Sequence, residues 1–196
     1  MKNAAPWKPR TFRELSAGLP DVPIEGDARS IIAVIGMARD SHGSLVYPSG
    51  CEITNLPRPL LHAHHLDEPL GAVTHATITK AGLHLRAVFA SPADPAAKRR
   101  IDRIWKSVLS GELACVSGAY DVLPGGGEPN GYGPYGKGWN ARRWTLRELS
   151  ICRQGANPTA RITVVTGTEA QVQRVIDQAR HEHATRPKDY AKVVRL

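Results

Sequence analysis

Short segments with the periodicity of β-strands recur along most of this chain, and they limit it to a mainly β fold. Residues 30–38 form a short β-branched run that a turn sequence closes. Residues 60–64, 71–79 and 82–89 continue the pattern, and Lys80-Ala81-Gly82 marks the turn between the last two segments. We therefore expect a set of short strands joined by tight turns.

One helix interrupts these strands. Asp94 is a typical N-cap, Pro95 occupies the first helical position and Gly111 follows the end. The apolar residues between them, Ile101, Ile104, Val108 and Leu109, follow helical spacing.

Residues 113–122 then alternate again, which places Cys115, Ser117 and Ala119 on one face of a strand and Val116, Gly118 and Tyr120 on the other. In residues 144–152 the alternation places Trp144, Leu146, Glu148, Ser150 and Cys152 on one face.

The order of these elements predicts an α+β fold, mainly β, that forms a mostly antiparallel barrel with helices outside. Residues 1–28 contain four prolines and no periodicity, so we expect an extended N-terminal arm before a domain at residues 29–166. Residues 124–138 hold seven glycines and three prolines, which predicts a mobile loop without regular structure. Residues 167–196 predict a C-terminal helix, opened by the capping box at Thr168, and a basic tail.

Composition narrows the class of protein. With 196 residues, of which 41% are apolar, the chain can bury one core, and no apolar run approaches the ~20 residues that span a bilayer. The first ten residues lack the apolar region of a signal peptide. Three cysteines without a C-x-x-C pair argue against a disulfide framework or a structural zinc site and favour a reducing compartment. The net charge of +8 suggests an acidic or polyanionic partner, although charge alone is a weak indication of nucleic-acid binding.

Three histidines crowd the end of one predicted strand. His62, His64 and His65 lie within four positions, and Asp67 follows. A surface turn accounts for such a cluster, but His62, His64 and Asp67 also approach the H-x-H-x-D-H zinc motif of metallo-β-lactamases. Glu68 stands where that motif has its final histidine. A metal-dependent hydrolase is therefore a weaker hypothesis.

Two predicted strands carry further chemistry. Ser117 lies in mid-strand beside Gly118, which allows a close approach by a substrate, and Cys115 shares its face as an alternative nucleophile. Both have a structural interpretation, as a strand hydroxyl and as a core thiol. Glu148 lies on a face with apolar residues and needs a partner, which could be a histidine or, at a sheet edge, Arg147, Arg153 or solvent.

Taken in order, three segments resemble the tailed-phage prohead proteases, which are capsid-maturation serine proteases related in fold to herpesvirus assemblin. Residues 59–71 resemble a family motif in which a histidine stands five residues before Pro-Ile-Gly, here His64 before Pro69. Residues 110–120 match the motif that places a serine after a helix and a glycine turn, here Ser117. Residues 146–160 match a Glu-Val-Ser motif followed by Pro-Ala-Asn-Pro, here from Glu148 onward.

The resemblance implies a serine endopeptidase with Ser117 as nucleophile, His64 as base and Glu148 orienting the histidine. His65 is the rival base, and Gly118, Arg153 and Arg161 are candidates to stabilise the oxyanion. Scaffold and major capsid protein, and the protease itself, are the implied substrates, inside the immature prohead in the host cytoplasm. Self-association is compatible with this role, and no cofactor, metal or membrane is expected.

Two other classes of function stay open. A relative without activity would keep the barrel and act as a capsid-assembly or scaffold-binding protein. A basic nucleic-acid-binding barrel would use exposed aromatic and cationic side chains to stack on bases. The residues available for that role are Tyr120, Tyr132, Tyr135, Trp139, Trp144, Lys137, Arg142 and Arg143.

Overall fold

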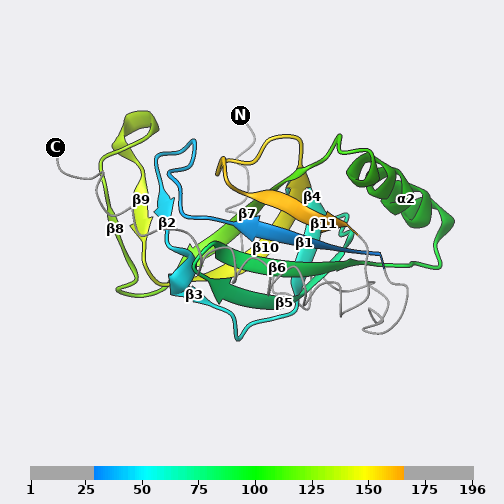
Figure 1. The fold of residues 1–196 in the computed structure, drawn as a ribbon, viewed down its shortest axis with the longest axis horizontal. Helices are drawn as coiled ribbons and strands as arrows, with labels where there is room; N and C mark the ends of the chain where they lie inside the picture. The colour runs from blue at the N-terminus through cyan, green and yellow to red at the C-terminus, as the bar shows by residue number, and fades with distance from the viewer. Residues whose placement is uncertain (1–28, 166–196) are drawn as a thin grey trace, which may run out of the picture.

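Seven strands of the protein close into a barrel in a computed structural model that describes residues 29–165 (Figure 1). Around the barrel the order is β4 (Arg58–His62), β5 (Gly71–Thr79), β6 (Gly82–Phe89), β1 (Ser30–Ile35), β11 (Arg161–Val165), β7 (Cys115–Val122) and β10 (Trp144–Cys152). β10 pairs back onto β4 in parallel, and the other neighbours are antiparallel. The predicted mainly β barrel is confirmed.

Short elements extend this barrel at one side. β3 (Cys51–Glu52) pairs with the start of β10, and the 3₁₀ turn η1 (Pro48–Gly50) precedes it. A second sheet joins β2 (Leu45–Val46), β9 (Trp139–Ala141) and β8 (Gly127–Pro129), and the 3₁₀ turn η2 (Pro134–Gly136) lies between β8 and β9. The prediction that residues 124–138 lack regular structure is therefore wrong, because β8 gains backbone hydrogen bonds from β9 that no local pattern reveals.

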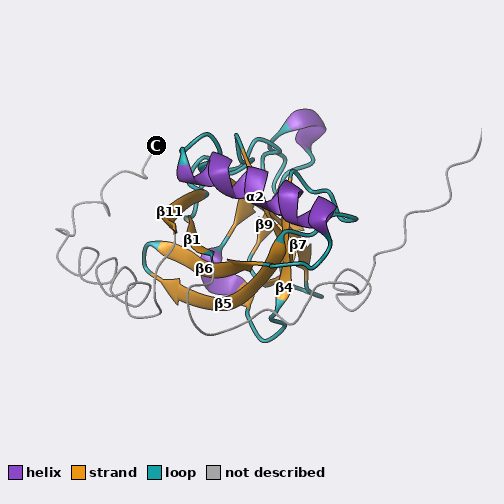
Figure 2. Cartoon of the chain, turned by 90° about the vertical axis from the view of Figure 1, so that its right-hand side faces the viewer, coloured by secondary structure: helices purple, strands orange, loops and turns teal. Residues whose placement is uncertain are grey.

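Helix α2 (Pro95–Leu109) lies across one end of the barrel (Figure 2). Asp94 Oδ2 accepts a hydrogen bond from the Ala97 N–H at 2.7 Å, and Gly111 after the helix has a φ of +77°, as the predicted caps require. The helix buries one apolar stripe, Ile101, Ile104, Trp105 and Val108. Trp105 packs edge to face on Phe89 with ring centroids 5.0 Å apart, which ties the helix to β6.

The strand predictions for residues 71–79 and 82–89 match β5 and β6. Three other predictions need correction or lie outside the described residues. The strand predicted at 60–64 ends at His62, because Ala63 and His64 turn away with positive φ. β11 was not anticipated. The arm at residues 1–28 and the C-terminal helix lie outside residues 29–165. No helix within that range is both long and apolar enough to cross a membrane.

A β-bulge in β10 changes which of its side chains share a face. Leu146 lies opposite Tyr120 and Glu148 lies opposite the next residue of β7, Ala119, so Arg147 is the extra residue. Trp144, Leu146, Leu149 and Ile151 therefore enter the core, whereas Glu148, Ser150 and Cys152 lie opposite Ala119, Ser117 and Cys115. The prediction of one face from Trp144 to Cys152 is wrong, because one inserted residue reverses the alternation.

Candidate active site

The site begins with two adjacent strands of the barrel. β7 keeps the predicted alternation, so Cys115, Ser117 and Ala119 share the face opposite the core residue Val116. β10 reaches the same face only beyond its bulge, where Ser150 lies directly opposite Ser117. The bulge thus removes Glu148 from an apolar face and places it beside the predicted nucleophile.

His64 comes to this face from the turn that follows β4. Ala63 and His64 both adopt left-handed backbone conformations, with φ of 47° and 63°. Two hydrogen bonds hold this turn against β10: the Ala63 N–H donates to the Ile151 carbonyl at 3.1 Å, and the His64 N–H donates to Ser150 Oγ at 2.9 Å. The strained turn therefore directs the His64 ring toward Glu148.

Glu148 is 1% exposed and hydrogen-bonded through both carboxylate oxygens. Its Oε1 lies 2.8 Å from His64 Nδ1 and accepts the Ala119 N–H at 2.9 Å. Its Oε2 accepts the Ser150 hydroxyl at 2.7 Å. The alternative partners are wrong, because Arg147 pairs with Asp121 and Arg153 pairs with Glu112. The buried carboxylate is thus compensated by donors from three different strands or turns.

The hydrogen bond between His64 and Glu148 determines the chemistry of the histidine. An ionised carboxylate only accepts hydrogen bonds, so Nδ1 carries the proton and the opposite nitrogen, Nε2, is left to act as a base. The bond to Glu148 raises the pKa of His64, against the opposing effect of partial burial, because the negative charge stabilises the imidazolium. By contrast, burial and the nearby His65 lower the pKa of His62.

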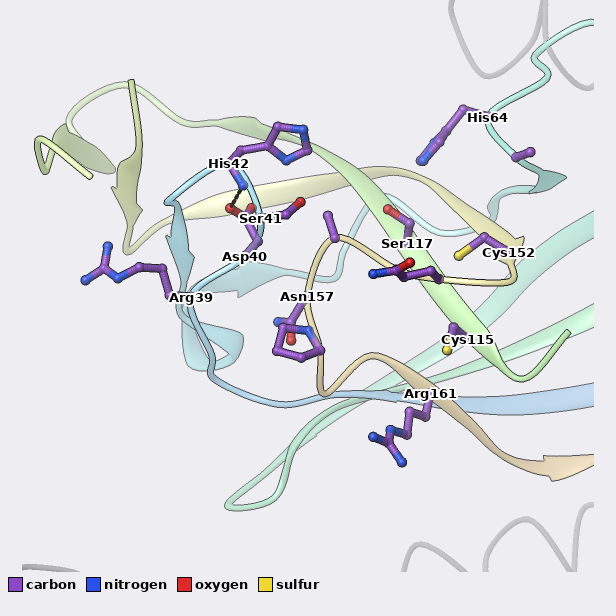
Figure 3. Close-up of a pocket in the computed structure, with 15 residues that line it drawn as sticks. Arg39, Asp40, Ser41, His42, His64, Cys115, Ser117, Cys152, Asn157 and Arg161 are labelled. Carbon is purple, nitrogen blue, oxygen red and sulfur yellow. Dashed lines mark hydrogen bonds between the residues drawn. The ribbon is translucent and has the colours of Figure 1, made fainter. Parts of the chain in front are cut away.

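A cleft of about 880 Å³ opens beside this face (Figure 3). His64 and Ser117 both line it, and in Figure 3 the His64 ring and the Ser117 hydroxyl lie on the same side of the cleft. Within residues 29–165, no hydrogen bond joins these two side chains. Such contacts often shorten only when a substrate is bound, so the arrangement suits a nucleophile and its base.

Two loops also line the cleft, at residues 39–42 and 154–158. In one, Asp40 Oδ1 accepts the N–H groups of His42 and Ser44, at 2.9 and 2.8 Å. The Ser41 N–H donates to the carbonyl of Ala156 in the other loop at 2.9 Å. Gly155 lies so close to β7 that a Cβ there would be 2.4 Å from the Val116 carbonyl oxygen. The sequence did not single out residues 39–42 as site residues, and the turn sequence after the first strand was their only signal.

The structure separates the remaining candidates by position. Arg161 lines the cleft, whereas Arg153 is bound to Glu112. Gly118 lines a smaller neighbouring cavity of about 50 Å³, which also touches Ser117. His65 donates its backbone N–H to the His62 carbonyl, and the centroids of the His65 and His62 rings are 6.5 Å apart. His64, not His65, therefore contacts Glu148.

Two earlier alternatives, a cysteine nucleophile and a metal site at the histidine cluster, can be compared with the structure. Cys115 and Cys152 line the cleft, and burial with the nearby Cys115 and Glu148 raises the pKa of Cys152 to about 11. Among residues 29–165, no three His, Cys, Asp or Glu side chains gather closely enough to hold a metal ion.

The residues suggested for stacking on bases divide into two groups. Tyr120 and Trp144 pack edge to face with centroids 5.7 Å apart, and Trp144 is only 2% exposed. Trp144 therefore belongs to the barrel interior and cannot stack on a nucleic acid, whereas Tyr120 is half-buried and packs against the core. Tyr132, Tyr135 and Trp139 are exposed on the small sheet side, where Arg39 lies over the Tyr132 ring at 3.8 Å. The predicted stacking surface thus loses Trp144.

Comparison with known proteins finds a similar sequence and similar solved structures. No protein-family model matches the sequence. The capsid polyprotein of Pseudomonas phage PAJU2 is 30% identical over 140 residues, which cover 67% of this chain and 19% of that relative. The chain therefore spans about one fifth of the length of this relative. The crystal structure of KSHV protease in complex with a hexapeptide phosphonate inhibitor aligns with a TM-score of 0.48 and 14% identity, over 79% of this chain and 74% of that one.

The pairing of its own strands establishes that this chain forms a barrel. The sequence match establishes that the chain is related to the capsid polyprotein of phage PAJU2. That relative is a capsid protein, which agrees with the link to phage capsids implied by the resemblance of the three sequence motifs. The chain is therefore a relative of a phage capsid polyprotein, which confirms the predicted link to phage capsids.

Proposed function

We propose that this chain is a serine endopeptidase that cleaves capsid or scaffold protein during maturation of a phage prohead. The observation that carries the proposal is the buried Glu148 carboxylate held on His64 Nδ1, with His64 and Ser117 lining one cleft. The similarity to a phage capsid polyprotein supports the class of substrate. In this proposal the protease acts inside the immature prohead and can also process its own chain.

The proposed reaction is acyl transfer. Ser117 Oγ forms a bond to the carbonyl carbon of the scissile peptide while His64 Nε2 takes the hydroxyl proton. The C–N bond then breaks, and His64 returns that proton to the leaving amine. Water hydrolyses the resulting ester in the same way and regenerates Ser117. Glu148 holds the ring in the required tautomer and stabilises the imidazolium that forms in each half of the reaction.

Negative charge develops on the substrate oxygen and requires donors. Arg161 lines the cleft and is the better placed of the two arginine candidates, because Arg153 is bound to Glu112. Backbone N–H groups beside Ser117, with Gly118 as the candidate, would supply the remainder. The two loops at Asp40 and Asn157 form the wall along which an extended peptide would lie.

The competing hypothesis is a relative without activity that binds capsid or scaffold protein. A fluorophosphonate probe distinguishes the two, because it reacts with an activated serine and not with an ordinary strand hydroxyl. We expect the full chain to gain the mass of one probe and Ser117→Ala to gain none. Cys115→Ala, which alters the neighbouring residue on the same face, is the matched control and should be labelled like the wild type. An unlabelled wild type, or labelling that survives in Ser117→Ala, would reject the proposed mechanism.

A further inference from the structure

Ser150 has no role in the proposed reaction, yet its hydroxyl contacts two members of the site. The residue is 0% exposed and lies on β10 directly opposite Ser117. Its Oγ donates to Glu148 Oε2 at 2.7 Å and accepts the backbone N–H of His64 at 2.9 Å. A single oxygen atom thus joins the carboxylate to the backbone of the histidine that this carboxylate orients.

From this geometry we infer that Ser150 is a positioning residue, which holds the turn carrying His64 in register with the Glu148 carboxylate. The inference rests on the proposed function, because it assigns the purpose of the contact to the same site. A hydroxyl has one hydrogen to donate and lone pairs to accept with, so serine can make both bonds at once. Alanine can make neither.

The surrounding hydrogen bonds explain why this link matters. Glu148 Oε1 is shared by the Ala119 N–H and His64 Nδ1, whereas Oε2 is held by Ser150. Without Ser150 the carboxylate can rotate about its remaining partners. The His64 turn also loses a hydrogen bond, although its backbone is in an unfavourable left-handed conformation. Both changes act on the contact between His64 Nδ1 and Glu148 Oε1.

The alternative is that Ser150 only fills space and satisfies polar groups inside the barrel wall. The two hypotheses predict different behaviour of His64. If Ser150 positions the pair, Ser150→Ala weakens the bond to Glu148 and the pKa of His64 falls toward its ordinary value. If Ser150 is only structural, stability changes while the pKa of His64 in the folded protein does not.

The test measures the His64 pKa by NMR titration of the full chain, with the signal assigned by its loss in His64→Ala. For Ser150→Ala we expect a lowered His64 pKa and labelling of Ser117 by the fluorophosphonate slowed by about 100-fold, the order of loss that a misplaced catalytic group causes. The matched control is Ser30→Ala, which removes the hydroxyl of another buried strand serine, 2% exposed, in β1. It should change neither quantity.

Ser150→Ala and Ser30→Ala both keep Glu148, which bonds to the His64 ring, and the neighbouring His62 and His65. They also keep the titratable groups that line the cleft with His64, namely Arg39, Asp40, His42, Cys115, Cys152 and Arg161. If Ser150→Ala does not fold, Ser150→Cys fills the site with a slightly larger side chain and weakens both hydrogen bonds, and the same fall in the pKa of His64 is expected. An unchanged His64 pKa in either folded variant overturns the inference. Failure of the wild type to react with the probe would instead reject the proposed protease activity, while the NMR comparison would still test Ser150.

Discussion

Replacing Glu148 with glutamine should test the charge of the site with little change in its geometry. The carboxylate is 1% exposed, so a substitute must have the same size and find hydrogen bonds. The amide oxygen of glutamine can take the position of Oε1 and accept from the Ala119 N–H and His64 Nδ1. The amide nitrogen then faces Ser150 Oγ, which can accept a second hydrogen bond. The negative charge beside His64 is the main feature that is lost.

The expected magnitude follows from that charge. Two unit charges about 4 Å apart interact by about 4 kcal/mol at an effective dielectric constant of about 20. The His64 side chain is 51% exposed, and water screens part of this interaction. We therefore expect the imidazolium to lose about 3–4 kcal/mol of stabilisation, which slows the reaction by roughly 100- to 1000-fold.

The assay is the rate constant for labelling of Ser117 by a fluorophosphonate, measured by intact mass, with a melting curve of the same preparation. The matched control is Glu128→Gln, which neutralises a carboxylate that is 60% exposed and paired with Arg142 on the small sheet. We expect the control to react within a factor of about two of the wild type, because exposed ion pairs contribute little. A Glu148→Gln protein that melts normally and reacts at the wild-type rate would refute the reasoning.

Four further predictions follow from the structure. The labelling rate of the wild type should rise with pH through a midpoint above the ordinary pKa of histidine, because Glu148 raises the pKa of His64 and only the neutral ring is a base. The ion pair should stabilise the folded protein below the unfolded pKa of His64 and cease to do so as pH rises through the folded pKa, which melting curves against pH will check. His64→Ala should slow labelling by about four powers of ten or more. His65→Ala should react nearly as the wild type, because the His65 ring faces His62, and the reverse order of the two rates would make His65 the base. Gly71→Ala should lower the free energy of unfolding by about 3 kcal/mol, because the new Cβ would lie 1.9 Å from the Val88 carbonyl oxygen. Urea titrations measure this change, and an unchanged midpoint would contradict the clash.

Local patterns predicted much of the barrel. Alternation over residues 71–79 and 82–89 matches β5 and β6, and Asp94, Pro95 and Gly111 marked the ends of α2. The same period of two placed Cys115, Ser117 and Ala119 on one face of β7, where the structure also has them. These features could be predicted because side-chain direction in a regular strand and capping of a helix depend only on neighbouring residues.

Tertiary structure decided how the site is assembled. The bulge at Arg147 depends on the register between β10 and β7, and it moves Glu148 from the apolar face that alternation predicts to the face of Ser117. His64 meets Glu148 across 84 residues of chain, through a left-handed turn that hydrogen bonds from β10 hold in place. Register and such distant hydrogen bonds depend on which strands pair when the barrel closes, so no local pattern in the sequence contains them.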